Sequence, residues 1–128
     1  MRYESTRGGL KGITAAEAIK LGIAPDGGLF VPMDRVSVDL EFVKGLVNDS
    51  YQERAMKILS LFLTDYTREE LSECIHRAYG SQFSSKDIAP VVRLHEQLHM
   101  LELWHGPTCA FKDMALQILP HFLVKAIQ

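Results

Sequence analysis

The sequence contains too little cysteine for a disulfide framework. Its only two cysteines, Cys74 and Cys109, lie far apart in a chain of 128 residues. A small secreted domain that depends on disulfides carries several closely spaced pairs, so this count favours a reducing compartment. The first residues are polar, and no signal-peptide core follows them. We therefore expect a cytoplasmic protein, with an organelle form released from a transit peptide as the alternative.

The sequence also lacks a large excess of charge of either sign. It has 14 Lys and Arg against 16 Asp and Glu, which gives a formal net charge of −2. Binding to nucleic acid or to an anionic membrane surface needs a basic patch, so we expect neither partner. No apolar run reaches the roughly 20 residues that cross a bilayer, so no membrane span is expected. The hydrophobic fraction of 47% is typical of a globular domain with a real core.

Three capping boxes predict where helices begin. In each, a Ser or Thr precedes a Glu by three residues, so the two residues can satisfy each other's backbone N–H groups. The pairs are Thr14 with Glu17, Ser50 with Glu53, and Thr67 with Glu70. The first pair predicts a short helix that ends near Gly22. The other two predict longer helices with apolar faces, the last of which should bury Leu71, Cys74, Ile75 and Ala78.

Between these helices the pattern is weaker. A helix is expected over residues 39–47, where apolar residues recur at helical spacing. The glycine-rich stretch 5–12 has neither dinucleotide nor P-loop spacing, and it is interpreted as a flexible N-terminal loop. Residues 29–31 are predicted to form a short strand that Pro32 stops.

The region after the third capped helix begins with a polar linker, residues 81–86, where we place a domain boundary. Residues 91–95 and 98–104 then predict two strands of a hairpin that turns at Glu96 and Gln97.

The sequence shows no pattern that identifies a metal site or a hydrolase. His95 and His99 are four residues apart, which suits a metal on a helix but has no special meaning on strands around a turn. No serine, cysteine or carboxylate pair has a spacing typical of hydrolytic enzymes. We therefore expect no bound metal.

Lys112 lies where a strand and a Gly-Pro turn lead into a long apolar helix that is predicted to begin at about residue 110. At about 100° per residue, Lys112 lines up with Leu116 and Leu119 and not with the polar stripe of this helix. One interpretation is a lysine whose amine reaches water from the helix end. The other is a partly dry site in which the neutral amine acts as a nucleophile. The pattern alone leaves both open.

The predicted helix over residues 110–128 is apolar on all but a narrow stripe. Such a helix is normally buried on several sides, and Pro120 should kink it by removing a hydrogen bond to Leu116. No later residues are present to cover it. We therefore expect a piece of a larger protein, or self-association through residues 110–128.

Three segments of the chain resemble the threonine synthase family. Residues 105–113, His-Gly-Pro-Thr-Cys-Ala-Phe-Lys-Asp, are similar to the motif around that family's pyridoxal-phosphate lysine. Residues 3–8 and 22–32 resemble parts of its N-terminal domain. The resemblance implies an α/β fold class. Residues 1–86 would form a mostly helical α+β N-terminal domain, and residues 87–128 the first elements of a fold-type II pyridoxal-phosphate enzyme domain.

The resemblance also implies an activity, the conversion of O-phospho-L-homoserine and water to L-threonine and phosphate with pyridoxal 5′-phosphate as cofactor. Lys112 would bind the cofactor covalently and would then move protons between substrate carbons. Asp113 would be a carboxylate in the first turn of the helix. Phe111 would help to exclude water from the cofactor ring.

The chain departs from the family in its length. Family members are several times longer, and their glycine-rich loop for the cofactor phosphate follows the lysine and is absent here. We therefore expect the chain alone neither to bind the cofactor tightly nor to turn over substrate. The alternatives are a threonine-synthase-like phospho-lyase, another fold-type II enzyme such as a dehydratase, and a non-catalytic helical interaction module in which Lys112 is solvated.

Overall fold

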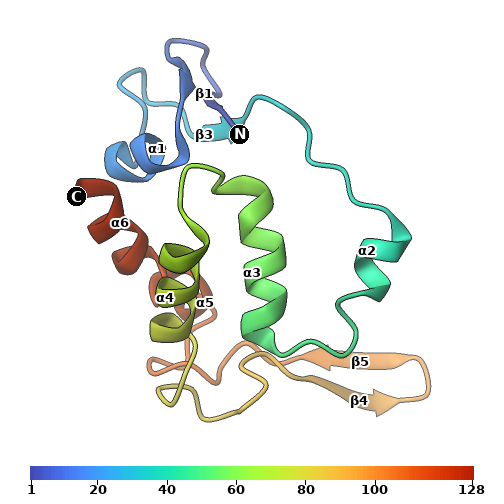
Figure 1. The fold of residues 1–128 in the computed structure, drawn as a ribbon. Helices are drawn as coiled ribbons and strands as arrows, with labels where there is room; N and C mark the ends of the chain where they lie inside the picture. Colours follow the sequence, from blue (N-terminus) through green and yellow to red (C-terminus); the bar gives the residue numbers. More distant parts are fainter.

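A computed structural model describes residues 1–128 as six helices and five short strands (Figure 1). In chain order they are β1 (Tyr3–Ser5), β2 (Lys11–Ile13), α1 (Ala15–Leu21), β3 (Phe30–Pro32), α2 (Leu40–Lys44), α3 (Tyr51–Phe62), α4 (Arg68–Ala78), β4 (Val91–His95), β5 (Leu98–Leu101), α5 (Asp113–Leu116) and α6 (Leu119–Ile127). This mixture of helices and strands confirms the expected α/β class.

The three predicted capping boxes are all formed. In α1, α3 and α4 the Ser or Thr side chain accepts a hydrogen bond from the third helical N–H, and the Glu at that position accepts one from the cap. A second carboxylate also caps the start of α1. Asp65 accepts hydrogen bonds from the backbone N–H groups of Ala15 and Ala16 at 3.2 and 2.8 Å. Asp65 lies between α3 and α4, so it joins α1 to the helical core. Gly22 ends α1 with φ of 71°, as predicted for a C-terminal glycine.

The prediction of a loop over residues 5–12 was correct only for residues 6–10, which connect β1 to β2. Strands β1 and β2 pair there as an antiparallel hairpin, and β3 pairs with the other edge of β1. Local sequence did not reveal these strands because each has only three residues and depends on its partners. The strand predicted at residues 29–31 is shifted by one, and Pro32 belongs to β3. A proline is tolerated there because β3 is an edge strand.

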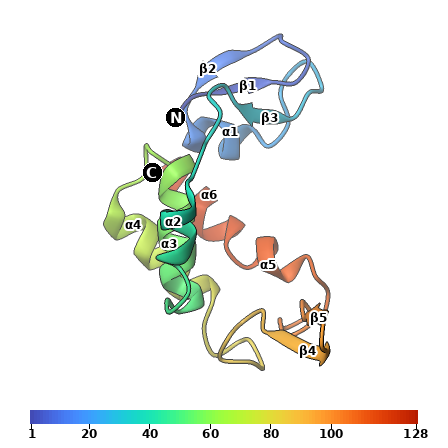
Figure 2. The same ribbon diagram turned by 90° about the vertical axis from the view of Figure 1, so that its right-hand side faces the viewer.

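The core lies between α4 and its neighbours. The predicted core positions of α4, which are Leu71, Cys74, Ile75 and Ala78, are all buried. Helix α6 packs against both α1 and α4 (Figures 1 and 2). Tyr66 donates a hydrogen bond to the carbonyl of Phe122 at 3.0 Å, and the two rings meet edge to face. Lys125 of α6 also pairs with Glu73 of α4 at 2.8 Å.

The polar linker predicted over residues 81–86 is not fully exposed. Phe83 is buried in the same core as α4, and so is Ile88 just beyond the linker. The polar residues around Phe83 concealed this contact, because its burial depends on the tilted packing of its ring against Tyr79.

The prediction of one helix over residues 110–128, kinked at Pro120, was also wrong. The chain forms the short helix α5 from residue 113 and then the separate helix α6, with a turn at Gln117 and Ile118. The predicted effect of Pro120 explains the break. Proline has no N–H to bond to the carbonyl of Leu116, and it is accommodated in the first turn of α6 instead.

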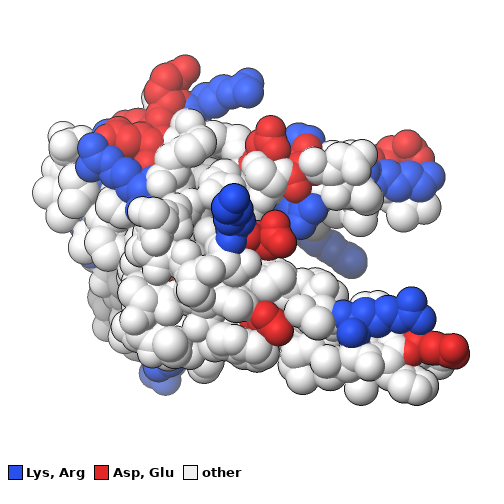
Figure 3. All heavy atoms as spheres, turned by 90° about the horizontal axis from the view of Figure 1, so that it is seen from below, with Lys and Arg blue, Asp and Glu red and all other residues white.

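Two segments project from the body of the molecule (Figures 1 and 3). One is the hairpin of β4 and β5, which turns at Glu96 and Gln97 as predicted. Its second strand ends at Leu101, earlier than the predicted residue 104, and one more backbone bond, from Glu102 N to Pro90 O at 2.9 Å, follows it. The other projection carries α2, which is shorter than the predicted helix over 39–47, and its apolar residues are largely exposed. Seen from below, charged side chains lie on both projections and also over the upper part of the body, whereas the lower part of the body is nearly free of them (Figure 3).

Candidate functional site

Lys112 is exposed at the start of α5, where it is the residue that precedes the first helical position. Its carbonyl accepts hydrogen bonds from Ala115 N at 3.0 Å and from Leu116 N at 2.8 Å, so its backbone is fixed. Its amine takes part in no hydrogen bond or ion pair. Of the two interpretations left open by the sequence, this chain therefore shows the exposed amine and not a dry pocket.

Asp113, the next residue, is turned inward and is only 1% exposed. Its carboxylate accepts hydrogen bonds from Thr108 N at 2.8 Å and from Thr108 Oγ1 at 2.9 Å, and Gln117 Nε2 approaches at 3.5 Å. The sequence predicted a carboxylate in the first turn of a helix, and Asp113 is indeed the first residue of α5. Its bond to Thr108 was not predicted, because it requires the preceding loop to fold back across five residues.

Gly106 makes this fold-back possible. A Cβ added to Gly106 would lie 2.5 Å from both Cβ and Oδ2 of Asp113, so no larger residue fits without a shift. The turn that follows includes Cys109 in a left-handed conformation with φ of 59°, and Cys109 N bonds to Gly106 O at 3.0 Å. The absence of a Cβ at Gly106 and the left-handed turn at Cys109 together determine the backbone position of Lys112.

His105 fixes the other end of the loop. Its Nε2 lies 2.6 Å from Glu102 Oε2, and its Nδ1 lies 2.9 Å from Ser84 Oγ. Ser84 N also donates to His105 O at 2.9 Å. The loop over residues 105–112 is therefore attached to the segment before β4 at one end and to Asp113 at the other. No pattern of the sequence indicated Ser84 or Glu102, since their contacts join segments that are distant along the chain.

Tyr79 anchors α5 to the helical core. Its hydroxyl donates to the carbonyl of Met114 at 2.6 Å, and burial raises the pKa of this phenol above its ordinary value. The side chain of Gln52 in turn donates to the carbonyl of Tyr79 at 2.6 Å. The helix that begins beside Lys112 is thus held by α3 and α4, which are rigid elements of the fold.

Aromatic side chains flank the lysine without being buried. Phe111 is 65% exposed, and Trp104 is 48% exposed with its ring 5.7 Å from that of His105. Leu116 and Leu119, the residues predicted to share the face of Lys112, are exposed as well. Exposed apolar side chains therefore precede and follow Lys112 in the chain.

A second network of hydrogen bonds lies at the opposite end of the molecule from the β4–β5 hairpin (Figures 1 and 2). Asp26 accepts hydrogen bonds from Ser5 Oγ at 2.7 Å, from Gly28 N at 2.9 Å and from Gly9 N at 2.8 Å. The bond from Ser5, followed by those from the backbone, holds the pKa of Asp26 below its ordinary value. Arg7 Nη1 donates to the carbonyl of Asp26 at 3.2 Å, so this arginine supports the turn.

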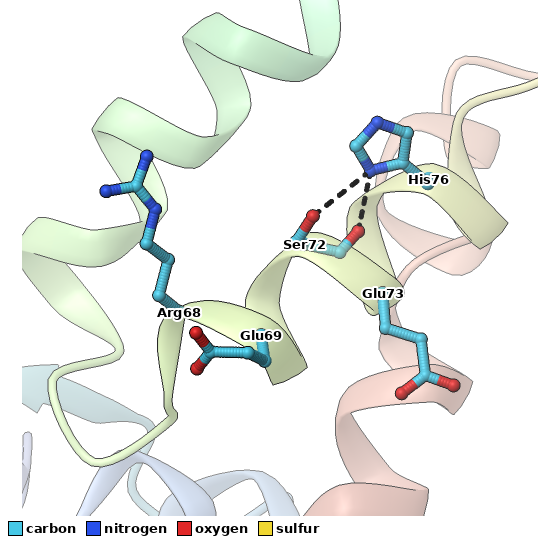
Figure 4. Close-up of a pocket in the computed structure, with 5 residues that line it drawn as sticks. All are labelled: Arg68, Glu69, Ser72, Glu73 and His76. Atoms are coloured by element: carbon cyan, nitrogen blue, oxygen red, sulfur yellow. Dashed lines mark hydrogen bonds between the residues drawn. The ribbon is translucent and has the colours of Figure 1, made fainter.

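The hollows of the surface lie elsewhere. One of about 510 Å³ lies along the outer face of α4 and is lined by Arg68, Glu69, Ser72, Glu73 and His76 (Figure 4). The imidazole of His76 turns back to its own helix, with Nδ1 2.8 Å from the carbonyl of Ser72. Another hollow, of about 480 Å³, is apolar and lies between α1, β3 and the start of α6. Lys112 lines neither of them.

Two further observations concern metal ions and membranes. No three His, Cys, Asp or Glu side chains come together in a way that could hold a metal ion. None of the helices has both the length and the apolar character that a membrane span requires.

Comparison with known proteins relates the chain to one family. Residues 2–79 match the family described as "Threonine synthase N terminus". The chain is 40% identical over 129 residues to threonine synthase-like 2 of Xenopus laevis, in an alignment that covers 96% of this chain and 27% of that protein. It is 38% identical over 119 residues to threonine synthase of Schizosaccharomyces pombe, which covers 91% of this chain and 23% of that protein. The chain thus spans about a quarter of the length of these relatives.

Solved structures give the same relationship. The structure of pyridoxal-phosphate-bound threonine synthase from Brucella melitensis superposes with a TM-score of 0.93 at 33% sequence identity, and the match covers 99% of this chain and 27% of that one. Threonine synthase from yeast superposes with a TM-score of 0.89 at 37% identity, covering 99% of this chain and 26% of that one.

Proposed function

Because the chain belongs to the family described as the threonine synthase N terminus, we propose that it is the N-terminal part of a pyridoxal-phosphate enzyme. The enzyme would convert O-phospho-L-homoserine and water to L-threonine and phosphate, and Lys112 would be its cofactor lysine. The observation that carries this proposal is the free amine of Lys112 on a loop fixed at both ends. A nucleophilic amine must be unpaired, and the absence of a partner for the Lys112 amine on a fixed backbone supports this role.

The residues present fit one part of the cofactor. Pyridoxal 5′-phosphate presents an aldehyde that a primary amine can bind, and an aromatic ring that packs on apolar surface. Lys112 provides the amine, while Phe111 and Trp104 provide exposed apolar surface in the same segment. We propose that the groups that bind the phosphate and the pyridine nitrogen belong to the part of the enzyme that this chain does not span.

The chemistry divides between the cofactor and the protein. When bound, the cofactor withdraws electrons from the substrate and so stabilises negative charge on its carbon atoms. Lys112 would hold the cofactor at Nζ, and after substrate has displaced it, Nζ would take up and return protons at the substrate carbons. Phe111 would keep water from the reacting atoms. Asp113 and the His105 contacts would keep the loop in place during these proton transfers.

The organisation of the chain follows from the same proposal. Residues 1–86 would form the N-terminal domain, which agrees with a family match that ends at residue 79, and residues 87–128 would begin the cofactor domain. The chain by itself would bind the cofactor weakly and would release no phosphate from substrate. We place the enzyme in the cytoplasm and expect the exposed apolar residues of 110–128 to make the isolated chain self-associate.

A second candidate function is that of a threonine-synthase-like phospho-lyase acting on a related phosphorylated amino acid. The observation that favours it is the 40% identity to threonine synthase-like 2, which is as high as the identity to threonine synthases. Both candidates use the same lysine and the same cofactor. They would differ in the substrate that releases phosphate, and an assay of phosphate release by the full enzyme would separate them.

The proposal is tested by trapping the cofactor on the chain. The protein is mixed with excess pyridoxal 5′-phosphate, reduced with borohydride and digested, and the mass shift is assigned to peptides. We expect the label on Lys112 and its loss in Lys112→Arg. The control Lys86→Arg changes another exposed lysine and should leave the label on Lys112 at the wild-type level. Label that is unaffected by Lys112→Arg would refute the role of Lys112.

A further inference from the structure

We infer that Asp113 is a positioning residue for Lys112, which acts through its hydrogen bonds to Thr108 and does not itself touch the cofactor. This inference rests on the proposed function of Lys112. It adds that the reactivity of the amine depends on a buried carboxylate next to it in the chain.

The position of Lys112 depends on its backbone, because its side chain has no partner. The carbonyl of Lys112 is held by α5, whose first residue is Asp113. Before Lys112 the chain makes a turn in which Asp113 N bonds to Ala110 O at 3.0 Å. The direction in which the amine leaves the backbone is therefore set by how this turn is joined to α5.

The side chain of Asp113 connects the turn before Lys112 to α5. Thr108 donates to it twice, once from its N–H and once from its hydroxyl, so the bonds fix both the distance and the rotation of the loop. The carboxylate is almost fully buried, and Gly106 packs directly against it. Rotation of Asp113 would leave the N–H of Thr108 without its acceptor, which keeps the arrangement in a single state.

The choice of a charged side chain is itself informative. A buried carboxylate is costly to desolvate, and an apolar side chain of similar volume would often stabilise a fold at least as well. What an apolar side chain cannot do is accept two hydrogen bonds from one residue of the loop. A carboxylate at this place therefore serves the geometry of the loop beside Lys112.

The experiment measures the rate at which Lys112 is labelled by excess pyridoxal 5′-phosphate and borohydride, divided by the rate at Lys20 and Lys86. These two lysines are exposed and lie outside the loop, so they serve as references within each molecule. In Asp113→Asn the amide keeps the size of the side chain but loses the negative charge that strengthens both bonds from Thr108, and it replaces one acceptor oxygen with an NH₂ donor. We expect the ratio to fall by about tenfold, since small misplacements of a reacting group reduce its rate strongly. Asp34→Asn, at an exposed aspartate, should leave the ratio unchanged.

Two variants of Thr108 test the positioning role of Asp113 even if Asp113→Asn fails to fold. Thr108→Ser keeps the hydroxyl and should retain the wild-type ratio, whereas Thr108→Val keeps the shape, loses the hydroxyl and should lower the ratio several-fold. A merely structural role would lower the urea midpoint of these variants without changing the ratio, and that result would overturn the inference. If wild-type Lys112 is labelled no faster than Lys20 and Lys86, the proposed function fails, and the inference fails with it.

Discussion

Replacement of Gly106 by alanine offers a sharp test of how the lysine loop is built. The new Cβ would lie 2.5 Å from Cβ and Oδ2 of Asp113, and these atoms have no room to retreat because Asp113 is buried. Overpacking of this kind costs about 1–3 kcal/mol, and loss of a hydrogen bond to a charged group adds about 1.5–3 kcal/mol. Since the loop can relax in part, we expect Gly106→Ala to lower the free energy of unfolding by about 3 kcal/mol.

The assay is urea unfolding followed by circular dichroism. For a denaturant slope of about 2 kcal/mol/M, a loss of this size moves the midpoint down by about 1.5 M. Gly45→Ala is the matched control, because Gly45 has helical dihedral angles (φ −63°, ψ −12°) at the end of exposed α2. That variant should be neutral or more stable by about 0.4–1 kcal/mol. If Gly106→Ala were as stable as Gly45→Ala, the close packing of the loop on Asp113 would be refuted.

Three further predictions concern the remainder of the fold. Asp65→Ala removes an acceptor of the Ala16 N–H and should lower the free energy of unfolding by about 1–2 kcal/mol in urea titrations. An unchanged free energy of unfolding would show that water replaces the carboxylate and would contradict this. The pKa of Asp26 is lowered in the folded chain, so its stabilisation is present above its ordinary value of 3.8 and is lost as the pH falls through the lower folded value. The difference in urea midpoint between wild type and Asp26→Asn should therefore shrink between pH 6 and pH 3, and a constant difference would contradict this. Burial raises the pKa of Tyr66 to about 12, so its neutral form stabilises the fold below pH 10 and this contribution is lost by about pH 12. In ultraviolet titrations, Tyr66→Phe should remove a phenol that ionises well above pH 10, and loss of a phenol that ionises near pH 10 would contradict the burial of Tyr66.

Local patterns of the sequence predicted the helices well. A capping box requires only two residues three positions apart, so Thr14, Ser50 and Thr67 identified the starts of α1, α3 and α4. Pro120 likewise predicted a break, because the missing N–H is a property of one residue. At these four positions the structure agrees with the local signal.

Contacts between distant segments could not be predicted in this way. Strand β1 is stable only because β2 and β3 pair with it on both sides, and Phe83 is buried only because the helices leave a place for its ring. The same limit applies to the candidate site. The motif identified Lys112 and Asp113, whereas the bond to Thr108 and the contact of His105 with Ser84 depend on how the loop folds back. The sequence thus singled out Lys112, and the structure added the contacts that hold its loop.

The relation between Lys112 and its surroundings explains why the chain alone should be a weak cofactor binder. Its amine is exposed, and neither of the hollows on α4 and beside α1 includes it. Tight binding of a cofactor needs a cavity that encloses most of its surface and several convergent polar groups. Under the proposed function, the loop fixed by Asp113 and His105 would be one wall of such a site.

The most direct measurement of this central claim is a titration of the chain with pyridoxal 5′-phosphate, in which borohydride trapping and peptide mapping are repeated at each concentration. We predict that Lys112 is labelled in preference to the other exposed lysines, and that its labelling approaches completion only when the cofactor is in large molar excess. Equal labelling of all exposed lysines at every concentration would contradict the assignment of Lys112. Complete labelling of Lys112 at one equivalent of cofactor would contradict the conclusion that this chain forms only part of the site.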